Sequence, residues 1–428
     1  MKAAFYALGC KVNQYEADCC ASIFRRKGYE IGAFDEKCDV YVVNTCSVTN
    51  IGDRKSRQVL RRAKKMNPDA IVVASGCYAQ THAEEIKKMP EVDIVAGTAN
   101  RHLIPEMVEG LLRGENPYTV CNIMKERLYE ELESEGTLER TRAYIKIQDG
   151  CDNFCSYCIV PYARGPVRSR RIENIKKEAL RLSEKGFFEV VLTGISVASY
   201  GKDLPEKPSL QDAVRAVCEI ENIRRVRLSS IDPRAFTKEF ISFLANEKKI
   251  CRHFHISLQS GSDTVLARMN RKYTRAQYAK YINDIRLAMP DAAITTDVIC
   301  GFPGETEDEF EQTKAFVKEI GFSKVHVFPY SQRSKTAAAQ MVQLPMTIRE
   351  NRAHELSKIC ESLSAEFEKG LIGSRQSVLF EQTQNGISEG LAKNYQRVYV
   401  YTKTPLDGKI ADVKIGKTEG GKLFADLI

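Results

Sequence analysis

The sequence lacks several features that would assign it at once to a familiar class of protein. No apolar run in its 428 residues approaches the roughly 20 residues that a membrane-spanning helix needs, which excludes an integral membrane protein. No low-complexity tract is present, and no internal repeat extends beyond a strand–helix unit. The Gly-rich stretch Gly301–Thr306 lacks the Gly-Lys-Ser/Thr of a phosphate-binding P-loop, so it predicts only a turn at the rim of a barrel.

The composition is that of a globular protein with a mild basic excess. Hydrophobic residues make up 43% and charged residues 28% of the chain, which argues against extended disorder. Lys and Arg number 64 against 56 for Asp and Glu, a net charge of +8 that permits an anionic partner without requiring one. The length suggests two to four domains. The first residues predict a short buried strand over Ala3–Gly9 rather than a signal peptide, so we expect a cytoplasmic location.

Three closely spaced cysteines predict a metal centre. The fourteen cysteines do not indicate a disulfide framework, because the cytosol keeps thiols reduced. Three of them lie in the loop Cys151-Asp152-Asn153-Phe154-Cys155-Ser156-Tyr157-Cys158, where their thiols can cap one metal site. A structural zinc site would need a fourth Cys or His nearby, and the next histidine is His253. An iron–sulfur cluster with three Cys ligands and one open iron fits better.

A second set of cysteines is dispersed but regular. Cys10, Cys46 and Cys77 each follow a short apolar run that predicts a buried strand, and a helical pattern follows each of them. In a parallel sheet the carboxyl ends of neighbouring strands share one edge, so these thiols could meet at one point. The alternative is three core cysteines, because free Cys is among the most buried residue types. We interpret the other eight as packing residues: Cys19, Cys20, Cys38, Cys121, Cys218, Cys251, Cys300 and Cys360.

The predicted elements divide the chain into four parts. Residues 1–115 alternate strand and helix and predict a parallel α/β domain, with strands over Lys2–Leu8, Val40–Asn44, Ala70–Ala74 and Val92–Ala96. Residues 116–141 include an acidic stretch with six glutamates, from Glu126 to Glu139, and predict an exposed linker.

The remaining two parts complete an α/β fold class with a small β-barrel at its end. Residues 142–369 predict a partial (β/α)6 barrel with its site residues at the carboxyl ends of the strands. Its expected strands are Ala143–Ile147, Val190–Thr193, Arg225–Ser229, Phe254–Leu258, Ala293–Cys300 and Lys324–Pro329. A long helix over Met346–Gly370 leads to residues 370–428, whose alternation without helices predicts a small β-barrel. His255 and His326 lie in predicted strands; we interpret them as core or supporting residues, with a position facing the barrel lumen as the alternative.

The cysteine loop, placed after the first strand of such a barrel, resembles the signature of the radical S-adenosylmethionine (SAM) superfamily. The resemblance implies that Cys151, Cys155 and Cys158 hold a [4Fe–4S] cluster whose open iron binds SAM. One electron then converts SAM into a 5′-deoxyadenosyl radical that attacks an unactivated C–H bond. The residues that we expect beside SAM are Tyr157, Thr193, Gly194, Ser229 and Gln259.

The whole chain resembles the radical SAM methylthiotransferases. The resemblance implies a second [4Fe–4S] cluster on Cys10, Cys46 and Cys77 and a terminal barrel of the tRNA-binding TRAM type. It also implies a monomer that receives electrons from a donor such as a flavodoxin or ferredoxin. Members of the family modify adenosine 37 of tRNA, which carries an isopentenyl or a threonylcarbamoyl group, or an aspartate of a ribosomal protein.

Short motifs favour the threonylcarbamoyladenosine branch. They are Asn44-Thr45-Cys46-Ser47-Val48-Thr49, Lys55-Ser56-Arg57-Gln58, Gly76-Cys77-Tyr78-Ala79-Gln80, Pro161-Tyr162-Ala163-Arg164-Gly165 and Leu192-Thr193-Gly194-Ile195. The chain departs from the family pattern at Ser196, where we expect His, and at Lys335, where we expect Gly. We expect that neither residue touches a cluster ligand, so that both departures leave the chemistry intact and affect only the substrate side. The isopentenyl and ribosomal-protein branches remain alternatives. So does a non-catalytic iron–sulfur RNA sensor or electron carrier, although a carrier would normally supply a fourth Cys.

Basic residues near both cysteine sets predict contacts with RNA phosphates. The candidates are Arg57, Arg61, Arg62, Arg164, Arg168, Arg170, Arg171 and Arg397. The alternative for a charge run is a solvated helix face. Tyr395, Tyr399 and Tyr401 alternate with basic residues on a predicted barrel strand, a pattern suited to base stacking, although half of these rings should point inward. Arg164 and Arg333 are candidates to bind the carboxylate of the threonylcarbamoyl group.

Overall fold

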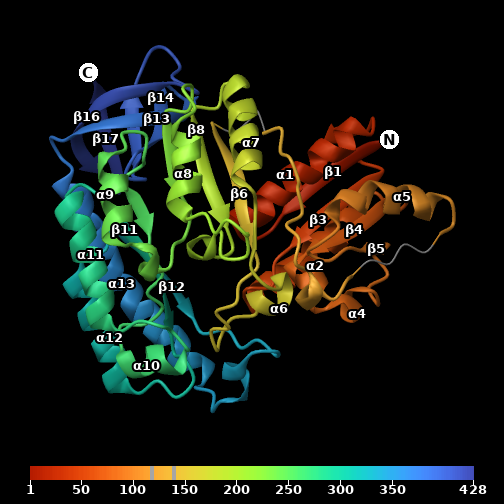
Figure 1. Ribbon diagram of the computed structural model, residues 1–428, viewed down its shortest axis with the longest axis horizontal. Helices are drawn as coiled ribbons and strands as arrows, with labels where there is room; N and C mark the ends of the chain where they lie inside the picture. The colour runs from red at the N-terminus through yellow and green to blue at the C-terminus, as the bar shows by residue number, and fades with distance from the viewer. Residues whose placement is uncertain (116–119, 137–140) are drawn as a thin grey trace.

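The computed structural model describes residues 1–115, 120–136 and 141–428. The other residues, 116–119 and 137–140, belong to the predicted linker and lie outside the described residues. Figure 1 shows three bodies along the chain: an N-terminal sheet with its helices, a central strand–helix arc and a terminal barrel. No helix in the described ranges is long and apolar enough to cross a membrane.

The N-terminal body is a parallel sheet in the order β2-β1-β3-β4-β5. Its strands are β1 (Lys2–Ala7), β2 (Glu30–Gly32), β3 (Val40–Thr45), β4 (Ile71–Gly76) and β5 (Ile94–Val95). Every residue of β3 and β4 is buried, as expected for strands covered on both faces. The helices are α1 (Lys11–Arg26), α2 (Asn50–Met66), α3 (Cys77–Thr81), α4 (Ala83–Ile86) and α5 (Ile104–Leu112), which follows the short turn η1 (Arg101–Leu103). The parallel α/β prediction is confirmed; only the short edge strand β2 was not expected.

The central body is the predicted partial barrel, built from two parallel sheets. One contains β6 (Arg142–Asp149), β8 (Glu189–Gly194) and β9 (Arg225–Leu228), with the short antiparallel strand β7 (Arg168–Ser169) at its edge. The other contains β10 (His253–His255), β11 (Ala293–Cys300) and β12 (Lys324–Pro329). Isolated parallel bridges, Val226 to Ile250 and Ile231 to Ile256, join the two into one arc of six strands. The bounds of β11 and β12 agree with the sequence prediction.

Helices cover the outer face of this arc: α7 (Ile172–Glu184), α8 (Leu210–Cys218), α9 (Lys238–Asn246), α11 (Arg275–Ala288) and α12 (Glu307–Ile320). The short helix α6 (Val160–Arg164) packs instead against α3 of the N-terminal body and against the short turn η2 (Ile123–Lys125). The short helix α10 (Asp263–Arg268) and the turns η3 (Val197–Ser199), η4 (Pro233–Ala235) and η5 (Ala337–Gln340) complete the central body. Thr306 and Glu309 form a reciprocal capping box at the start of α12. The long α13 (Met346–Gly370) has the predicted bounds and packs along β12 before the chain enters the terminal barrel.

The terminal barrel is closed in the order β13-β14-β15-β17-β16. Its strands are β13 (Arg375–Gln384), β14 (Ile387–Ala392), β15 (Arg397–Tyr401), β16 (Ile410–Glu419) and β17 (Lys422–Leu427). The expectation that half of the aromatic rings point inward is wrong. Val398 and Val400 fill the interior, so the alternation along β15 leaves Tyr399 and Tyr401 on the outer face, beside Phe424.

The acidic segment after the N-terminal body is not an exposed linker. Residues 126–136, here called the acidic strap, lie along both α1 and the central body, and their glutamates pair with arginines of both. Leu132 is buried, and its carbonyl accepts a hydrogen bond from the hydroxyl of Tyr15 on α1. Local composition suggested a solvated stretch because the arginines that neutralise it are remote in the sequence.

Candidate active site and cluster sites

The cysteine loop is held at the carboxyl end of β6 by hydrogen bonds to its backbone, and Arg271 donates to the Sγ of Cys155 at 3.4 Å. Gly150 has a φ of +72°, and a Cβ there would lie 1.8 Å from the carbonyl oxygen of Pro166, so only Gly fits. The Cys151 N–H donates to the Gly165 carbonyl at 3.0 Å, and the Asn270 amide donates to the Phe154 carbonyl at 3.1 Å. These contacts fix both halves of the loop.

All three loop thiols line one cavity of about 670 Å³. The five residues expected beside SAM line it too: Tyr157, Thr193, Gly194, Ser229 and Gln259. They come from the loop and from the carboxyl ends of β8, β9 and the strand-like segment after β10. This agrees with the prediction that site residues lie at the carboxyl ends of the barrel strands. Cys10 also lines this cavity, so one member of the dispersed set faces the same space as the loop.

The chemistry of this cavity fits an iron–sulfur cluster and SAM. The Oγ of Ser229 is buried and has no hydrogen-bond partner in the part of the chain that the structure describes, which leaves it available to a bound molecule. Burial raises the pKa of Cys158 to about 12, and repulsion from the charge of Cys155 adds to the shift. Burial likewise raises the pKa of Cys151. A bound cation would compensate for this crowding of sulfur charges.

The dispersed cysteines lie at the carboxyl edge of the N-terminal sheet. Cys10 precedes α1 after β1, Cys46 directly follows β3, and Cys77 begins α3 after β4; these are adjacent parallel strands. A Cβ on Gly9, whose φ is +90°, would lie 2.6 Å from the Sγ of Cys46, so Gly allows the Cys10 segment to approach Cys46 closely. Burial raises the pKa of Cys46 to about 12, with added repulsion from Cys77 and Cys10. The three sulfurs therefore share one electrostatic environment.

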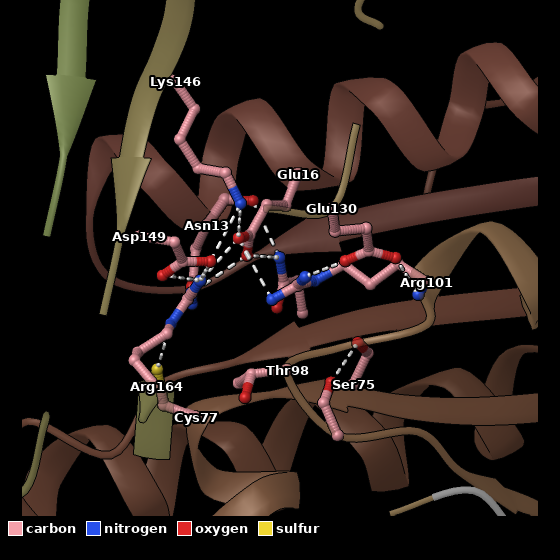
Figure 2. A network of polar contacts seen from close by, with 12 residues as sticks. Asn13, Glu16, Ser75, Cys77, Thr98, Arg101, Glu130, Lys146, Asp149 and Arg164 are labelled. Atoms are coloured by element: carbon pink, nitrogen blue, oxygen red, sulfur yellow. Dashed lines mark hydrogen bonds and ion pairs between the residues drawn. The ribbon is translucent and has the colours of Figure 1, made fainter. Parts of the chain in front are cut away.

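A buried network of charges joins this sheet edge to the cysteine loop (Figure 2). The carboxylate of Glu16 on α1 pairs with Arg164 at 2.5 Å, Lys146 at 2.9 Å and Arg101 at 3.0 Å. Asp149, which directly precedes Gly150, pairs with Lys146 at 3.0 Å. Cationic neighbours lower the pKa of Glu16 to about 2 despite its complete burial. The network thus locks α1 against β6 and the base of the loop.

Arg164 is a structural link and not an RNA contact. Its side chain is fully buried, and its Nε donates to the Sγ of Cys77 at 3.2 Å while its other nitrogens bind Glu16 and Asn13. The predictions that Arg164 contacts a phosphate or the threonylcarbamoyl carboxylate are therefore wrong. Its acidic partner, Glu16, lies 148 positions away, which is why the acid-free run around Arg164 was misleading.

Three further arginines are also engaged inside the protein. Arg168 is buried and donates to the Arg164 carbonyl at 2.9 Å, and Arg170 is buried against Glu178 and Glu131, so neither is available to RNA. Arg333, the other carboxylate candidate, pairs with Asp53 at 2.5 Å and donates to Ser47 at 3.0 Å. Its role is to fasten the segment after Cys46 to the segment after β12.

The other predicted RNA contacts lie at or near the surface. Arg61, Arg62, Arg171 and Arg397 are exposed, and Arg57 is half-buried with its guanidinium donating to the hydroxyl of Tyr78 at 2.7 Å. Arg397 also pairs with Glu389 at 2.8 Å and Glu381 at 3.2 Å. These residues remain candidates for phosphate contacts.

The departure at Ser196 affects the cysteine loop directly. Ser196 lines the cavity, and its hydroxyl hydrogen-bonds Cys151, which opposes the rise in the pKa of that thiol. The expectation that neither departure touches a cluster ligand is therefore wrong for Ser196. The ammonium of Lys335 donates to the Thr81 carbonyl at 3.1 Å, at the end of α3.

A second cavity, of about 690 Å³, adjoins the first one on the side of the terminal barrel. The two cavities share Lys11, Ser230, Asp297 and His326 among their lining residues. Asp297 pairs with the Nε2 of His255 at 3.1 Å, and Asp297 and His326 face each other across β11 and β12. His255, Asp297 and His326 come from three adjacent strands, so no ligand-like spacing is visible in the sequence. His255 and His326 line the cavity and are not enclosed in a core.

Family models match two parts of the chain. The Radical SAM superfamily matches residues 145–317, and the uncharacterized protein family UPF0004 matches residues 2–97. Among solved structures, the radical SAM methyltransferase TsrM from Kitasatospora setae, with tryptophan and a SAM analogue bound, has a TM-score of 0.57 at 15% identity. The match covers 79% of this chain and 74% of TsrM, and it shows a shared fold.

Curated relatives cover nearly the whole chain. The threonylcarbamoyladenosine tRNA methylthiotransferase MtaB of Bacillus subtilis is 44% identical over 97% of this chain and 93% of its own length. The protein of the same name from Aquifex aeolicus is 42% identical over 86% of this chain and 90% of its own length. The tRNA-2-methylthio-N(6)-dimethylallyladenosine synthase of Lachnoclostridium phytofermentans is 37% identical, over 98% and 94% respectively. These relatives, together with the cysteine loop at the cavity, show that the chain belongs to the radical SAM methylthiotransferase family.

Proposed function

We propose that the protein converts N6-threonylcarbamoyladenosine at position 37 of tRNA into its 2-methylthio derivative. The observation that carries the proposal is the convergence of the cysteine loop and Cys10 on one cavity, which would place a radical source and a sulfur donor side by side. The MtaB relatives, 42–44% identical, favour this substrate over dimethylallyladenosine, whose synthases are 33–37% identical. A MtaB at 35% from Thermotoga maritima falls within the lower range, so the argument depends on the two higher identities.

The cysteines would hold the metal groups on which this chemistry depends. Membership of the radical SAM superfamily implies one [4Fe–4S] cluster with SAM, and we assign it to Cys151, Cys155 and Cys158. We assign a second [4Fe–4S] cluster to Cys10, Cys46 and Cys77. When bound, these groups supply a carbon radical that removes the C2 hydrogen of the adenine, and the sulfur and methyl group that replace it.

The protein's own residues would bind and orient these groups. Thr193, Gly194, Ser229 and Gln259 form the wall on which SAM would lie, with the free hydroxyl of Ser229 as a hydrogen-bond partner. The hydrogen bond from Arg164 to Cys77 would place a fixed positive charge beside the second cluster, and such hydrogen bonds raise cluster potentials.

The remaining expectations complete the proposal. The domains would comprise residues 1–115, a connecting segment over 116–141 that includes the packed acidic strap, the radical SAM core over 142–369 and the TRAM-like barrel over 370–428. The protein would act as a cytoplasmic monomer that takes single electrons from a flavodoxin or ferredoxin. Arg57, Arg61, Arg62, Arg171 and Arg397 would contact tRNA phosphates.

Mass spectrometry of tRNA nucleosides tests the proposed substrate. Cells without the gene should lose the 2-methylthio-threonylcarbamoyl nucleoside, wild-type protein should restore it, and Cys155→Ala should not. Cys121→Ala is the matched control, because Cys121 belongs to neither cysteine set, and it should restore the nucleoside.

Two other results would point elsewhere. Loss of the methylthio-isopentenyl nucleoside, or of a ribosomal-protein modification alone, would assign the protein to another branch of the family. A reconstituted, reduced protein that forms no 5′-deoxyadenosine from SAM would favour the non-catalytic sensor or electron carrier.

A further inference from the structure

Lys11 is a cation without an ion-pair partner among the described residues. It is the first residue of α1, directly after Cys10, and it lines both the cavity of the cysteine loop and the adjoining second cavity. Within residues 1–115, 120–136 and 141–428, no hydrogen bond or ion pair joins its ammonium to another side chain. The ammonium of Lys11 lies 5.8 Å from the ring centre of Tyr395. A largely enclosed cation without a partner indicates room for an anion.

The surroundings of Lys11 are built around the ring of Tyr395 and two arginines. The ring of Tyr395 stacks on His253 at 4.6 Å, and the guanidinium groups of Arg227 and Arg142 lie 4.7 Å and 5.8 Å from its centre. Tyr395 comes from the turn between β14 and β15, where its φ is +70°, so the terminal barrel supplies this wall of the second cavity.

Two acids of this region pair with the arginines beside Tyr395. Glu189 pairs with Arg227 at 2.9 Å, and Glu381 pairs with Arg142 at 2.7 Å. Asp297, at the junction of the two cavities, lies 3.1 Å from the Nε2 of His255, and Glu368 lines the second cavity. Among the described residues no ion pair joins Lys11 to any of these acids, at the passage between the terminal barrel and the cysteine loop.

We propose that Lys11 binds the carboxylate of the threonylcarbamoyl group and thereby selects this substrate. The inference rests on the proposed function, which brings the modified adenine into the cavity of the cysteine loop. The threonylcarbamoyl group carries one carboxylate, whereas isopentenyladenosine and unmodified adenosine carry no charge on the base. A carboxylate on Lys11 would lie at the junction of the two cavities. Lys11 would thus bind the carboxylate for which the sequence suggested Arg164 and Arg333. Those two arginines are unavailable, because each pairs with an acid inside the protein.

Binding of two matched RNAs tests this assignment. The probes are anticodon stem-loops that carry threonylcarbamoyladenosine, or the same nucleoside with its carboxylate converted into a carboxamide, and the protein is the reconstituted full chain. Wild-type protein should bind the carboxylate RNA roughly tenfold to a hundredfold more tightly, the range for a hydrogen bond to a charged group. Lys11→Met should bind both RNAs equally, with the affinity of wild-type protein for the carboxamide.

Control variants separate this role from a structural one. Lys238→Met, at an exposed lysine on α9, should keep the full preference for the carboxylate. Lys11→Gln is a second neutral variant should Lys11→Met fail to fold, and iron and sulfide content would verify that each variant is loaded. A preference as large as that of wild-type protein in either neutral variant would overturn the role of Lys11.

The same samples distinguish this failure from failure of the proposed function. Methylthiolated product from the carboxylate RNA, together with an undiminished preference in Lys11→Met, overturns only the Lys11 assignment. Wild-type protein that forms no product from this RNA and does not prefer it to the carboxamide overturns both.

Discussion

Replacing Glu16 by Gln should destabilise the protein more than any surface charge change, because Glu16 balances three buried cations. Its side chain is fully buried, and Arg101, Lys146 and Arg164 lie within 3.0 Å of its carboxylate. The pKa of Glu16 is lowered from 4.5 to about 2, a difference that corresponds to about 3 kcal/mol of stability at neutral pH. Removing one partner of a buried ion pair typically costs about 3–5 kcal/mol of stability, which agrees with the value from the pKa.

Urea unfolding followed by far-ultraviolet circular dichroism and tyrosine fluorescence measures this cost, since the chain has 18 Tyr and no Trp. Glu36→Gln is the matched control: Glu36 pairs with Lys2 at 2.7 Å, but water screens that exposed pair, so the change should be small. A lowered pKa in the folded state means that the contribution of Glu16 is complete above about pH 4.5 and is lost as the pH falls towards about 2.

The difference in stability between wild-type protein and Glu16→Gln should therefore stay constant from pH 7 to about pH 5 and narrow as the pH falls from about 4.5 towards about 2. Two results would refute this reasoning. One is a loss in Glu16→Gln no greater than in Glu36→Gln, and the other is a difference that widens as the pH falls.

Two further predictions concern the cysteine loop and RNA binding. Gly150→Ala should prevent iron binding at the loop, because the new Cβ would meet the Pro166 carbonyl; Gly114→Ala, also at positive φ but with no atom within 4 Å, should keep its iron. Equal iron and sulfide contents in the two variants would contradict this. Arg171→Gln should weaken tRNA binding and reduce the slope of log K against log salt by about one. Arg170→Gln should instead lower the melting temperature, because it removes the partner of buried Glu178, and the opposite pattern would reverse the two assignments.

The elements that the sequence predicted well are those in which a local pattern suffices. The hydrophobic runs of β11 and β12 and the capping box of α12 are local signals, and the structure has them at the expected residues. The strand-end position of the cysteines was also predictable, because parallel topology fixes which ends of the strands share an edge. The short strands β2 and β7 were not predicted, since only three and two residues, respectively, form them.

The charged residues could not be placed from the sequence, because their partners are remote. Arg164 and Arg170 lie in an acid-free stretch, yet each is neutralised by an acid on another element, Glu16 on α1 and Glu178 on α7. Lys11 is the opposite case. Glu16 is close to it in the sequence, on the same helix α1, but Glu16 pairs with other cations and Lys11 has no ion pair with it. Sequence composition reports how many charges a segment has, and only the fold decides which of them remain unpaired.

The Glu16 network also constrains the order in which the protein can be made. When residues 1–115 leave the ribosome, Glu16 can pair only with Arg101 among its three cations, because Lys146 and Arg164 are still to be synthesised. The Sγ of Cys77 likewise still lacks the Arg164 guanidinium that donates to it in the folded protein. The N-terminal sheet therefore emerges with an incompletely neutralised face on α1, and it reaches its final form only after the first strand and helix of the barrel have emerged. Insertion of iron at Cys10, Cys46 and Cys77 would then follow the synthesis of residue 164, well after their own translation.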